Sequence, residues 1–224
     1  MRGKTTTSSA IGVKRTTRLW FLAIVNCLGF LAAACSSDQA AIETTTTQPP
    51  PPEIPALALD AYAKLGTPCQ GVDWALLAGI GKVESDHGRI FGGTIEPDGT
   101  VSPIVLGPPL DGSGVGGNTT PMPVGEWVGQ YGIAGEWLQA VGPMQFLPGS
   151  FEIHGADGNN DGVQDPHNLY DAAAAAANLL CSQTLAEGAD PNDVILAYNQ
   201  STEYQEEVLL WANRYRSGRL ELAR

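Results

Sequence analysis

The sequence has few basic side chains, and they are unevenly distributed. Of its 224 residues, 12 are Lys or Arg and 24 are Asp or Glu, which gives a net charge of −12 at pH 7. Five of the basic groups lie in residues 1–34, which contain no acidic group, so the rest of the chain has 7 basic and 24 acidic side chains, a net charge of −17. A body of this charge repels nucleic acid and anionic lipid. A nucleic-acid partner is therefore excluded.

Repeats, long apolar runs and histidine clusters are also missing. No internal repeat is visible, and 43% hydrophobic with 16% charged residues excludes a collagen-like, coiled-coil or wholly disordered chain. The three histidines, His87, His154 and His167, lack the spacing of zinc ligands, so no catalytic transition metal is expected. The apolar run of residues 19–34 is shorter than the roughly 20 residues that cross a bilayer as a helix, which makes a transmembrane anchor the less favoured interpretation.

The N-terminal residues instead have the layout of a secretory signal. A basic, Thr/Ser-rich stretch precedes the apolar run, which ends in small residues directly before Cys35. We predict that residues 1–34 are a signal peptide for export across a bacterial membrane. Leu31 to Cys35, followed by two serines, resembles a bacterial lipobox, although Ala32 stands where Leu is usual. Lipidation of Cys35 would hold the protein on the outer face of the cell membrane, and without it the protein would be secreted.

Residues 35–55 are predicted to be a linker, and residues 56–224 a single folded domain. Residues 36–55 are almost free of apolar side chains and contain four consecutive threonines and four consecutive prolines, so they cannot repay the entropy of ordering. At roughly 3.1 Å per residue in polyproline-like stretches, this linker could hold the domain up to about 60 Å from the membrane. The remainder is long enough to bury one sizeable core.

The domain is predicted to be mainly α-helical. Apolar spacing of three and four residues, capping residues and small side chains indicate helices. They are expected at Leu57–Leu65, at Val72–Ser85 with Asp73 as cap, at Asn168–Cys181 around six alanines, at Asn192–Asn199 after Pro191, and through Tyr204, Val208, Trp211 and Tyr215 to an end at Ser217-Gly218.

A long loop or small β lid is expected between Gly88 and Gly125. Its 38 residues contain ten glycines and six prolines, with short apolar runs such as Val101–Leu106 that could pair as brief strands. A loop of this length in a compact domain is usually functional or disordered. Its position directly after Glu84 favours a function.

Two of the four cysteines are predicted to form a disulfide. Cys27 would leave with the signal peptide and Cys35 would carry the lipid, so Cys69 and Cys181 remain in an oxidising compartment. The alternative is a pair of buried free thiols.

Glu84 is a candidate general acid. It ends an apolar helix, where partial burial would raise its pKa and keep it protonated. Common glycosidases need a second carboxylate across the scissile bond, and Asp86 is the nearest in sequence. Residues two apart point to opposite sides of a helix, so Asp86 would share the cleft only if the helix had already ended. A mechanism with a single acid is therefore favoured.

Two further segments combine polar and apolar groups suited to holding a sugar. One is Ala140–Ser150, in which prolines and glycines shape the backbone around Gln145, and the other is Ala197–Ser201 with its phenol and carboxamide. Without further evidence, the residues of each segment are explained more simply by a structural role than by substrate binding.

In their order and spacing, the three segments resemble lytic transglycosylases of the membrane-bound murein transglycosylase B type. The resemblance spans about Ile54 to Tyr215. It implies a lysozyme-like fold and places Glu84 on the catalytic glutamate of the family. The substrate-binding residues that it implies are Ser85, Met144, Gln145, Phe146, Tyr198 and Asn199. Gly149 departs from the serine that is usual there, so a hydrogen bond at that position is in question.

The resemblance also implies the chemistry. The glutamate would cleave the bond between N-acetylmuramic acid and N-acetylglucosamine of peptidoglycan with help from the substrate's own acetamido group, and would leave a 1,6-anhydro end. No cofactor is implied for this chemistry, and the chain would act as a monomer. The alternatives are a muramidase on the same fold and a wall-binding scaffold lipoprotein without activity.

A candidate calcium loop runs from Asp157 to Asn168. Oxygen side chains occupy loop positions 1, 3 and 5, a glycine follows at 6 and a backbone carbonyl at 7, as in an EF-hand. The expected ligands are Asp157, Asn159, Asp161, Val163, Asp165 and Asn168. Because an amide replaces the usual bidentate carboxylate at position 12, affinity is expected to be weak and the role structural. The alternative is a turn rich in Asp and Asn.

Overall fold

The computed structural model describes residues 54–66, 69, 71–184 and 193–222. Every described residue belongs to one compact unit of the chain, Thr47–Arg224. The predicted signal peptide, Cys35 and all but the last two linker residues lie outside the described residues. Among the described helices, none combines the length and apolar character needed to cross a membrane.

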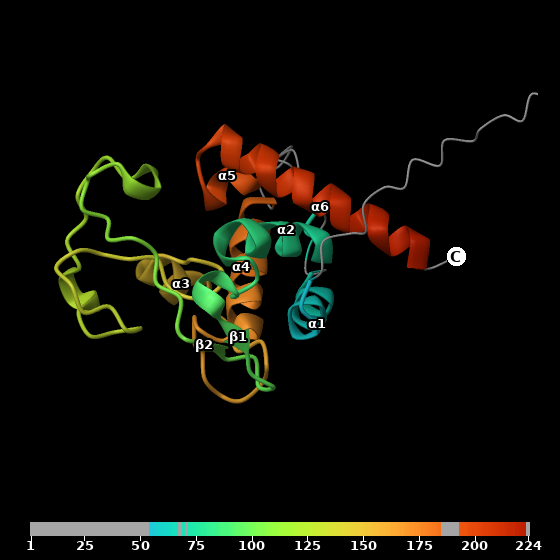
Figure 1. Ribbon diagram of the computed structural model, residues 1–224, viewed down its shortest axis with the longest axis horizontal. Helices are drawn as coiled ribbons and strands as arrows, with labels where there is room; N and C mark the ends of the chain where they lie inside the picture. Colours follow the sequence, from blue (N-terminus) through green and yellow to red (C-terminus); the bar gives the residue numbers. More distant parts are fainter. Residues whose placement is uncertain (1–53, 67–68, 70, 185–192, 223–224) are drawn as a thin grey trace, which may run out of the picture. The chain divides into compact units, whose positions relative to one another are not determined.

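The described domain is mainly α-helical, as the sequence predicts (Figure 1). Two short antiparallel strands pair Thr94 with Ser102 and Ile95 with Val101. The elements are α1 (Ala56–Leu65), α2 (Trp74–Ser85), β1 (Thr94–Ile95), β2 (Val101–Ser102), α3 (Pro148–His154), α4 (Leu169–Thr184), α5 (Ile195–Tyr198) and α6 (Thr202–Leu222).

Helix α2 lies at the centre of the core and carries Glu84 near its end. Asp73 caps it by accepting a hydrogen bond from the Leu76 N–H at 2.9 Å, as predicted. The helix packs most extensively against α6, which lies alongside it in Figure 1. A Cβ on Gly79 would lie 2.6 Å from the Val208 carbonyl oxygen of α6, and one on Gly81 would lie 2.1 Å from the Tyr62 hydroxyl of α1. These two glycines therefore allow α1 and α6 to approach the helix that positions Glu84.

Helix α4 supplies small side chains to the same core. Four of its six consecutive alanines, Ala172, Ala173, Ala175 and Ala176, are fully buried. It contacts α1, α2, α3 and α5. Because alanine favours the helix and occupies little space, several neighbours can pack closely around one helix.

The loop between α2 and α3 is longer than predicted and contains its own small core. From Asp86 to Leu147 the described chain has only short 3₁₀ turns, the two strands and isolated bridges. We call residues 103–147 the lid. A second buried cluster within it comprises Val124, Ile133, Leu138 and Val141, and in Figure 1 the lid extends to one side of the helices. This separate core makes the lid a structured segment.

One helix was not predicted, and the ends of several others differ from the prediction. Helix α3 was not predicted, although Pro148 occupies its first turn, where the missing N–H has no helical partner to lose. Helix α5 begins at Ile195, and the predicted start at Asn192 lies outside the described residues. Helix α6 was predicted to end at Ser217-Gly218 and instead continues to Leu222. A glycine inside a helix costs only about 1 kcal/mol, which the residues around it can offset.

Cys69 and Cys181 form the predicted disulfide, with an S–S distance of 2.07 Å. It joins the segment between α1 and α2 to α4, across 112 residues of sequence. The helical core that supports Glu84 is thereby closed covalently.

Candidate functional site

Glu84 lines a pocket of about 410 Å³. Gln145 lines the same pocket, so the structure brings together two of the residues that the sequence singled out. The other lining residues come from the turn after α2 and from the start of the lid, and they are Ile90, Phe91, Val105, Leu106, Gly107 and Pro108. A carboxyl and an amide therefore face a largely apolar cavity.

Tyr204 of α6 holds the Glu84 carboxyl. Its hydroxyl donates a hydrogen bond to Glu84 Oε1 at 2.5 Å, across 120 residues of sequence. Burial raises the pKa of Glu84 to about 7, and the hydrogen bond from Tyr204 opposes that rise. Burial and the charge of Glu84 raise the pKa of Tyr204 well above its usual value, so this phenol stays protonated and remains a donor. Glu84 is thus poised to gain and lose a proton near neutral pH.

Asp86 does not act as a second acid in this pocket. It is the C-cap of α2, with a left-handed φ of 52°, so the helix has ended before it. Its Oδ1 accepts hydrogen bonds from Lys82 at 2.5 Å and from Arg89 at 2.9 Å. Burial acts to raise the pKa of Asp86, but the two cations hold it below its usual value. Asp86 is therefore ionised, and its carboxylate forms ion pairs with Lys82 and Arg89.

Ser85 connects the end of α2 to the segment that carries Gln145. Its hydroxyl donates to the Pro143 carbonyl oxygen at 2.5 Å and accepts from the Gly88 N–H at 2.7 Å. Gln145 has a left-handed φ of 49°, and its Nε2 donates to the Gly142 carbonyl oxygen at 2.8 Å. Ser85 is 1% exposed. Its observed role is therefore to position the pocket, while Gln145 is available to a ligand.

The side chains of Met144 and Phe146, which were expected to contact a substrate, are buried and do not line the Glu84 pocket. They are 0% and 3% exposed. The left-handed backbone at the residue between them turns these two apolar neighbours into the core while Gln145 lines the pocket. Tyr198 donates a hydrogen bond to the Met144 carbonyl oxygen at 2.6 Å. These residues support the wall of the pocket from behind.

A row of aromatic rings continues this support to Glu84. The Phe146 ring meets Tyr198 edge-on with centroids 5.4 Å apart, and Tyr198 stacks on Tyr204 at 6.5 Å. Asn199 is exposed, and its Oδ1 accepts from the Ser201 N–H at 3.0 Å, so it caps the turn before α6. The structure therefore brings Tyr198 beside the tyrosine that holds Glu84, while Asn199 stays on the surface.

A buried His–Tyr cluster lies behind the end of α2 and was missed by the sequence reasoning. His87 is 0% exposed, and its two ring nitrogens lie 3.2 Å from the Tyr62 hydroxyl and 3.1 Å from the Tyr215 hydroxyl. Burial lowers the pKa of His87 to about 3, so the ring is neutral at physiological pH. A neutral imidazole can donate from one nitrogen and accept at the other, which ties α1 and α6 to the end of α2. Only its position three residues after Glu84 could have drawn attention to it.

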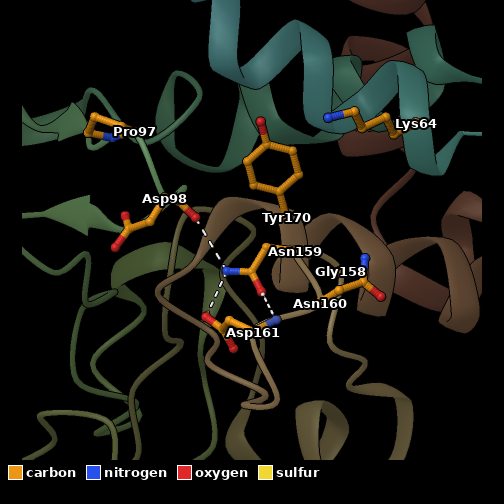
Figure 2. Close-up of a pocket in the computed structure, with 8 residues that line it drawn as sticks. All are labelled: Lys64, Pro97, Asp98, Gly158, Asn159, Asn160, Asp161 and Tyr170. Atoms are coloured by element: carbon orange, nitrogen blue, oxygen red, sulfur yellow. Dashed lines mark hydrogen bonds between the residues drawn. The ribbon is translucent and has the colours of Figure 1, made fainter.

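The first half of the candidate calcium loop is a turn closed by side-chain hydrogen bonds. The Asp157 carboxylate accepts hydrogen bonds from the N–H groups of Asp161 at 3.0 Å and Gly162 at 2.9 Å, and Gly162 has the left-handed φ of 91° that a sharp turn requires. Asn159 donates to the Asp161 carboxylate at 2.8 Å, and both line an open pocket of about 470 Å³ (Figure 2). Within the described residues, no cluster of three or more His, Cys, Asp or Glu side chains is arranged to hold a metal ion.

Asn168 does not take the role expected at position 12 of the loop. Its Oδ1 accepts from the Tyr170 N–H and its Nδ2 donates to the Asp98 carbonyl oxygen, both at 2.9 Å. The amide therefore caps the start of α4 and fastens the turn that precedes β2. The buried Asp171 instead fastens the loop, by accepting from the N–H groups of Gly158 at 2.7 Å and Asp165 at 2.9 Å.

Comparisons with known proteins found similar solved structures and one matching family model. Two Escherichia coli Slt35 lytic transglycosylase structures are similar. One, in complex with bulgecin A, is 15% identical over 75% of this chain and 76% of that chain, with a TM-score of 0.46. The other, in complex with calcium, is 16% identical over 75% and 77%, with a TM-score of 0.45. No curated protein matches the chain.

A family model described as the Transglycosylase SLT domain matches residues 126–192. The matched segment contains Gln145 and the candidate calcium loop, while Glu84 precedes it and Tyr204 follows it. The chain thus contains a match to a Transglycosylase SLT domain over residues 126–192, and Gln145 within the matched segment lines the same pocket as Glu84.

Proposed function

We propose that this chain is a peptidoglycan lytic transglycosylase that cleaves the β-1,4 bond between N-acetylmuramic acid and N-acetylglucosamine and leaves a 1,6-anhydro end. The observation that carries the proposal is Glu84, whose raised pKa, pocket and hydrogen bond from Tyr204 suit a group that serves first as an acid and then as a base. The family-model match supports the substrate class.

In the first step, Glu84 donates its proton to the glycosidic oxygen. Because Tyr204 donates to Oε1, that oxygen acts as the acceptor, and the transferable proton resides on Oε2. A pKa of about 7 leaves much of the carboxyl protonated at neutral pH, and general acids work best when their pKa lies near the working pH. Bond cleavage then leaves positive charge on the sugar and negative charge on Glu84.

The substrate's own acetamido group stabilises the positive charge. Among the described residues that line the pocket, Glu84 is the sole carboxyl, and the neighbouring Asp86 is engaged with Lys82 and Arg89. A mechanism with one protein carboxyl matches this arrangement. No enzyme nucleophile is needed, because the neighbouring group is already held against the reacting carbon.

In the second step, the ionised Glu84 accepts the proton of the C6 hydroxyl of the same sugar, whose oxygen closes on C1. The hydrogen bond from Tyr204 stabilises the carboxylate formed by the first step. The protons balance, because Glu84 gives one proton to the leaving oxygen and recovers one from the C6 hydroxyl. Apart from Glu84 and Gln145, the described residues that line the pocket have no polar side chain to hold an attacking water, which favours ring closure over hydrolysis.

Digestion of purified peptidoglycan tests the reaction. Mass spectrometry should find products lighter by one water than reducing-end fragments, and Glu84→Gln should yield none. Reducing ends would identify a muramidase instead. Binding to the wall without cleavage would identify a scaffold lipoprotein.

We also propose that the protein is exported and anchored through a lipid on Cys35. The signal-like residues 1–34, the small residues before Cys35 and the proline-rich linker support this placement, which would bring the domain to the wall. Mass spectrometry of the mature N-terminus tests it. A diacylated Cys35 at the first position is expected, and an unmodified N-terminal residue would contradict the proposal.

The loop from Asp157 to Asp165 is proposed to bind calcium in a structural role. Its oxygen side chains are hard ligands, and the hydrogen bonds from Asp161 and Gly162 to the Asp157 carboxylate support a compact turn around such an ion. Asp157, Asn159, Asp161 and Asp165 would hold the ion with the Val163 carbonyl. Because Asn168 is engaged elsewhere, the affinity should fall in the weak range of about 10⁻⁴–10⁻³ M.

A further inference from the structure

Phe91 is unusually exposed for an aromatic side chain. It is 76% exposed, belongs to neither of the two buried clusters in the described part of the chain, and still lines the pocket that contains Glu84. A phenylalanine left in water forgoes about 1.5–3 kcal/mol of burial free energy. An exposed ring that lines the pocket of Glu84 therefore needs an explanation outside the stability of the free protein.

The backbone of Phe91 is also in an unfavourable conformation. Its φ of 62° and ψ of 21° lie in the left-handed region, which costs a non-glycine residue roughly 1–2 kcal/mol. The residues beside it in the 3₁₀ turn are Ile90 and Gly92, and glycine would suit the position of Phe91 better than any other residue. A side chain that is both exposed and strained points to a functional contact.

The turn that carries Phe91 is held from both sides. The Arg89 carbonyl oxygen accepts hydrogen bonds from the N–H groups of Gly92 at 3.0 Å and Gly93 at 3.2 Å, and the Arg89 side chain is bonded to Asp86. A Cβ on Gly93 would lie 2.1 Å from the Gly88 carbonyl oxygen, so the turn closes tightly on itself. The ring is thus presented on a fixed support directly after α2.

We propose that Phe91 is a sugar-binding platform that packs against the apolar face of one ring of the glycan strand next to Glu84. This inference rests on the proposed function and adds a specificity-determining residue to it. A pyranose ring has an apolar face of C–H groups and a polar edge of hydroxyls. The pocket matches this division, because Phe91, Ile90 and Val105 are apolar while Glu84 and Gln145 are polar.

The platform also accounts for the strain. The backbone that carries the ring is fixed before binding, and the ring itself has only two side-chain torsions. Binding a sugar therefore costs less conformational entropy than it would with a residue on a mobile turn, and more of the contact energy contributes to affinity. Because the ring is exposed in the free protein, truncating it should cost little stability. Loss of binding can therefore be measured without loss of the fold.

The test compares Phe91→Ala, Phe91→Leu and Phe91→Trp with the wild type and with Ile153→Ala. Ile153 on α3 is 77% exposed and does not line the pocket, so it controls for loss of an exposed apolar side chain. Steady-state cleavage of soluble peptidoglycan strands gives kcat and KM. Calorimetry with an N-acetylglucosamine tetramer, performed in the Glu84→Gln background, gives the dissociation constant without turnover.

Phe91→Ala should weaken tetramer binding and raise KM by about tenfold, while kcat changes by less than about threefold and the melting temperature stays unchanged. Phe91→Trp should restore binding, Phe91→Leu should restore only part of it, and Ile153→Ala should match the wild type. Equal binding by Phe91→Ala and a wild type that cleaves peptidoglycan would overturn the platform alone. A wild type that neither binds nor cleaves would overturn the proposed function with it.

Discussion

The Tyr204 hydroxyl lies 2.5 Å from Oε1 of Glu84, although 120 residues separate them in the sequence. The hydrogen bond stabilises the ionised carboxyl, while burial of the same carboxyl stabilises the protonated form. These opposed effects leave the pKa of Glu84 at about 7. A carboxyl that must give up a proton and take it back benefits from this balance.

Replacing Tyr204 by Phe should shift the pH profile of cleavage. The variant loses the hydrogen bond that lowers the pKa of Glu84, so that pKa should rise and the alkaline limb of kcat should move to higher pH. The expected fall in kcat at neutral pH is about tenfold. Tyr170→Phe, which removes a hydroxyl bonded to Asp60, is the matched control and should leave the profile in place. An unchanged alkaline limb in Tyr204→Phe would contradict the assigned role.

Glu84→Gln should abolish cleavage and stabilise the fold at alkaline pH. The folded-state pKa of about 7 exceeds the unfolded value of 4.5, so the stability contributed by the protonated carboxyl is present below pH 4.5 and is lost as pH rises through 7. A glutamine does not titrate. The free energy of unfolding of Glu84→Gln relative to the wild type should therefore increase by about 2 kcal/mol between pH 4.5 and pH 8. Unfolding in denaturant at pH 4.5 and pH 8 measures it. A constant difference between the two proteins would indicate that Glu84 is not buried as described.

His87 should make the protein sensitive to acid. Its folded-state pKa of about 3 lies below the unfolded value of 6.5, so the stability contributed by the neutral ring is present above pH 6.5 and is lost as pH falls toward 3. His87→Gln should be about 2 kcal/mol less stable at pH 7, because it disturbs the bonds to Tyr62 and Tyr215. Its stability should nevertheless fall less steeply below pH 6.5. His154→Gln is the control, and equal slopes in all three proteins would exclude this role of His87.

Removing the disulfide should lower stability strongly. Cys69 and Cys181 close a loop across 112 residues, and a link of this span stabilises a fold by about 4 kcal/mol in the chain-entropy description. The double variant Cys69→Ser/Cys181→Ser should therefore have a melting temperature well below that of the wild type. A reducing agent should lower the melting temperature of the wild type only. Titration of the unfolded, unreduced wild type should find neither of these thiols free. Two free thiols would mean that the bond does not form in the isolated protein.

Calcium at millimolar concentration should raise the melting temperature without changing kcat. Binding to the folded state alone stabilises by mass action, and a weak site needs a concentration above its dissociation constant. A chelator should reverse the shift, and Asp161→Asn should reduce it. Identical melting curves with calcium and with chelator would contradict calcium binding by this loop.

Local features of the sequence were enough to predict most of the helical framework. Helix α1 begins within one residue of the prediction, Asp73 caps α2, and the alanine run forms the helix α4. These predictions succeed because capping and helix propensity act between residues that are close along the chain. The cysteine pairing also followed, since the expected export and lipidation left only two candidates.

The sequence by itself determined most of the helices, the disulfide pair and a glutamate at the end of an apolar helix. Only the tertiary structure decided that Tyr204 holds this glutamate, that Met144 turns inward while Gln145 lines the pocket, and that Asn168 caps α4. The reason is physical. Each of these outcomes depends on which distant groups meet in the folded chain or on a left-handed backbone at one residue, and neither is encoded in local periodicity.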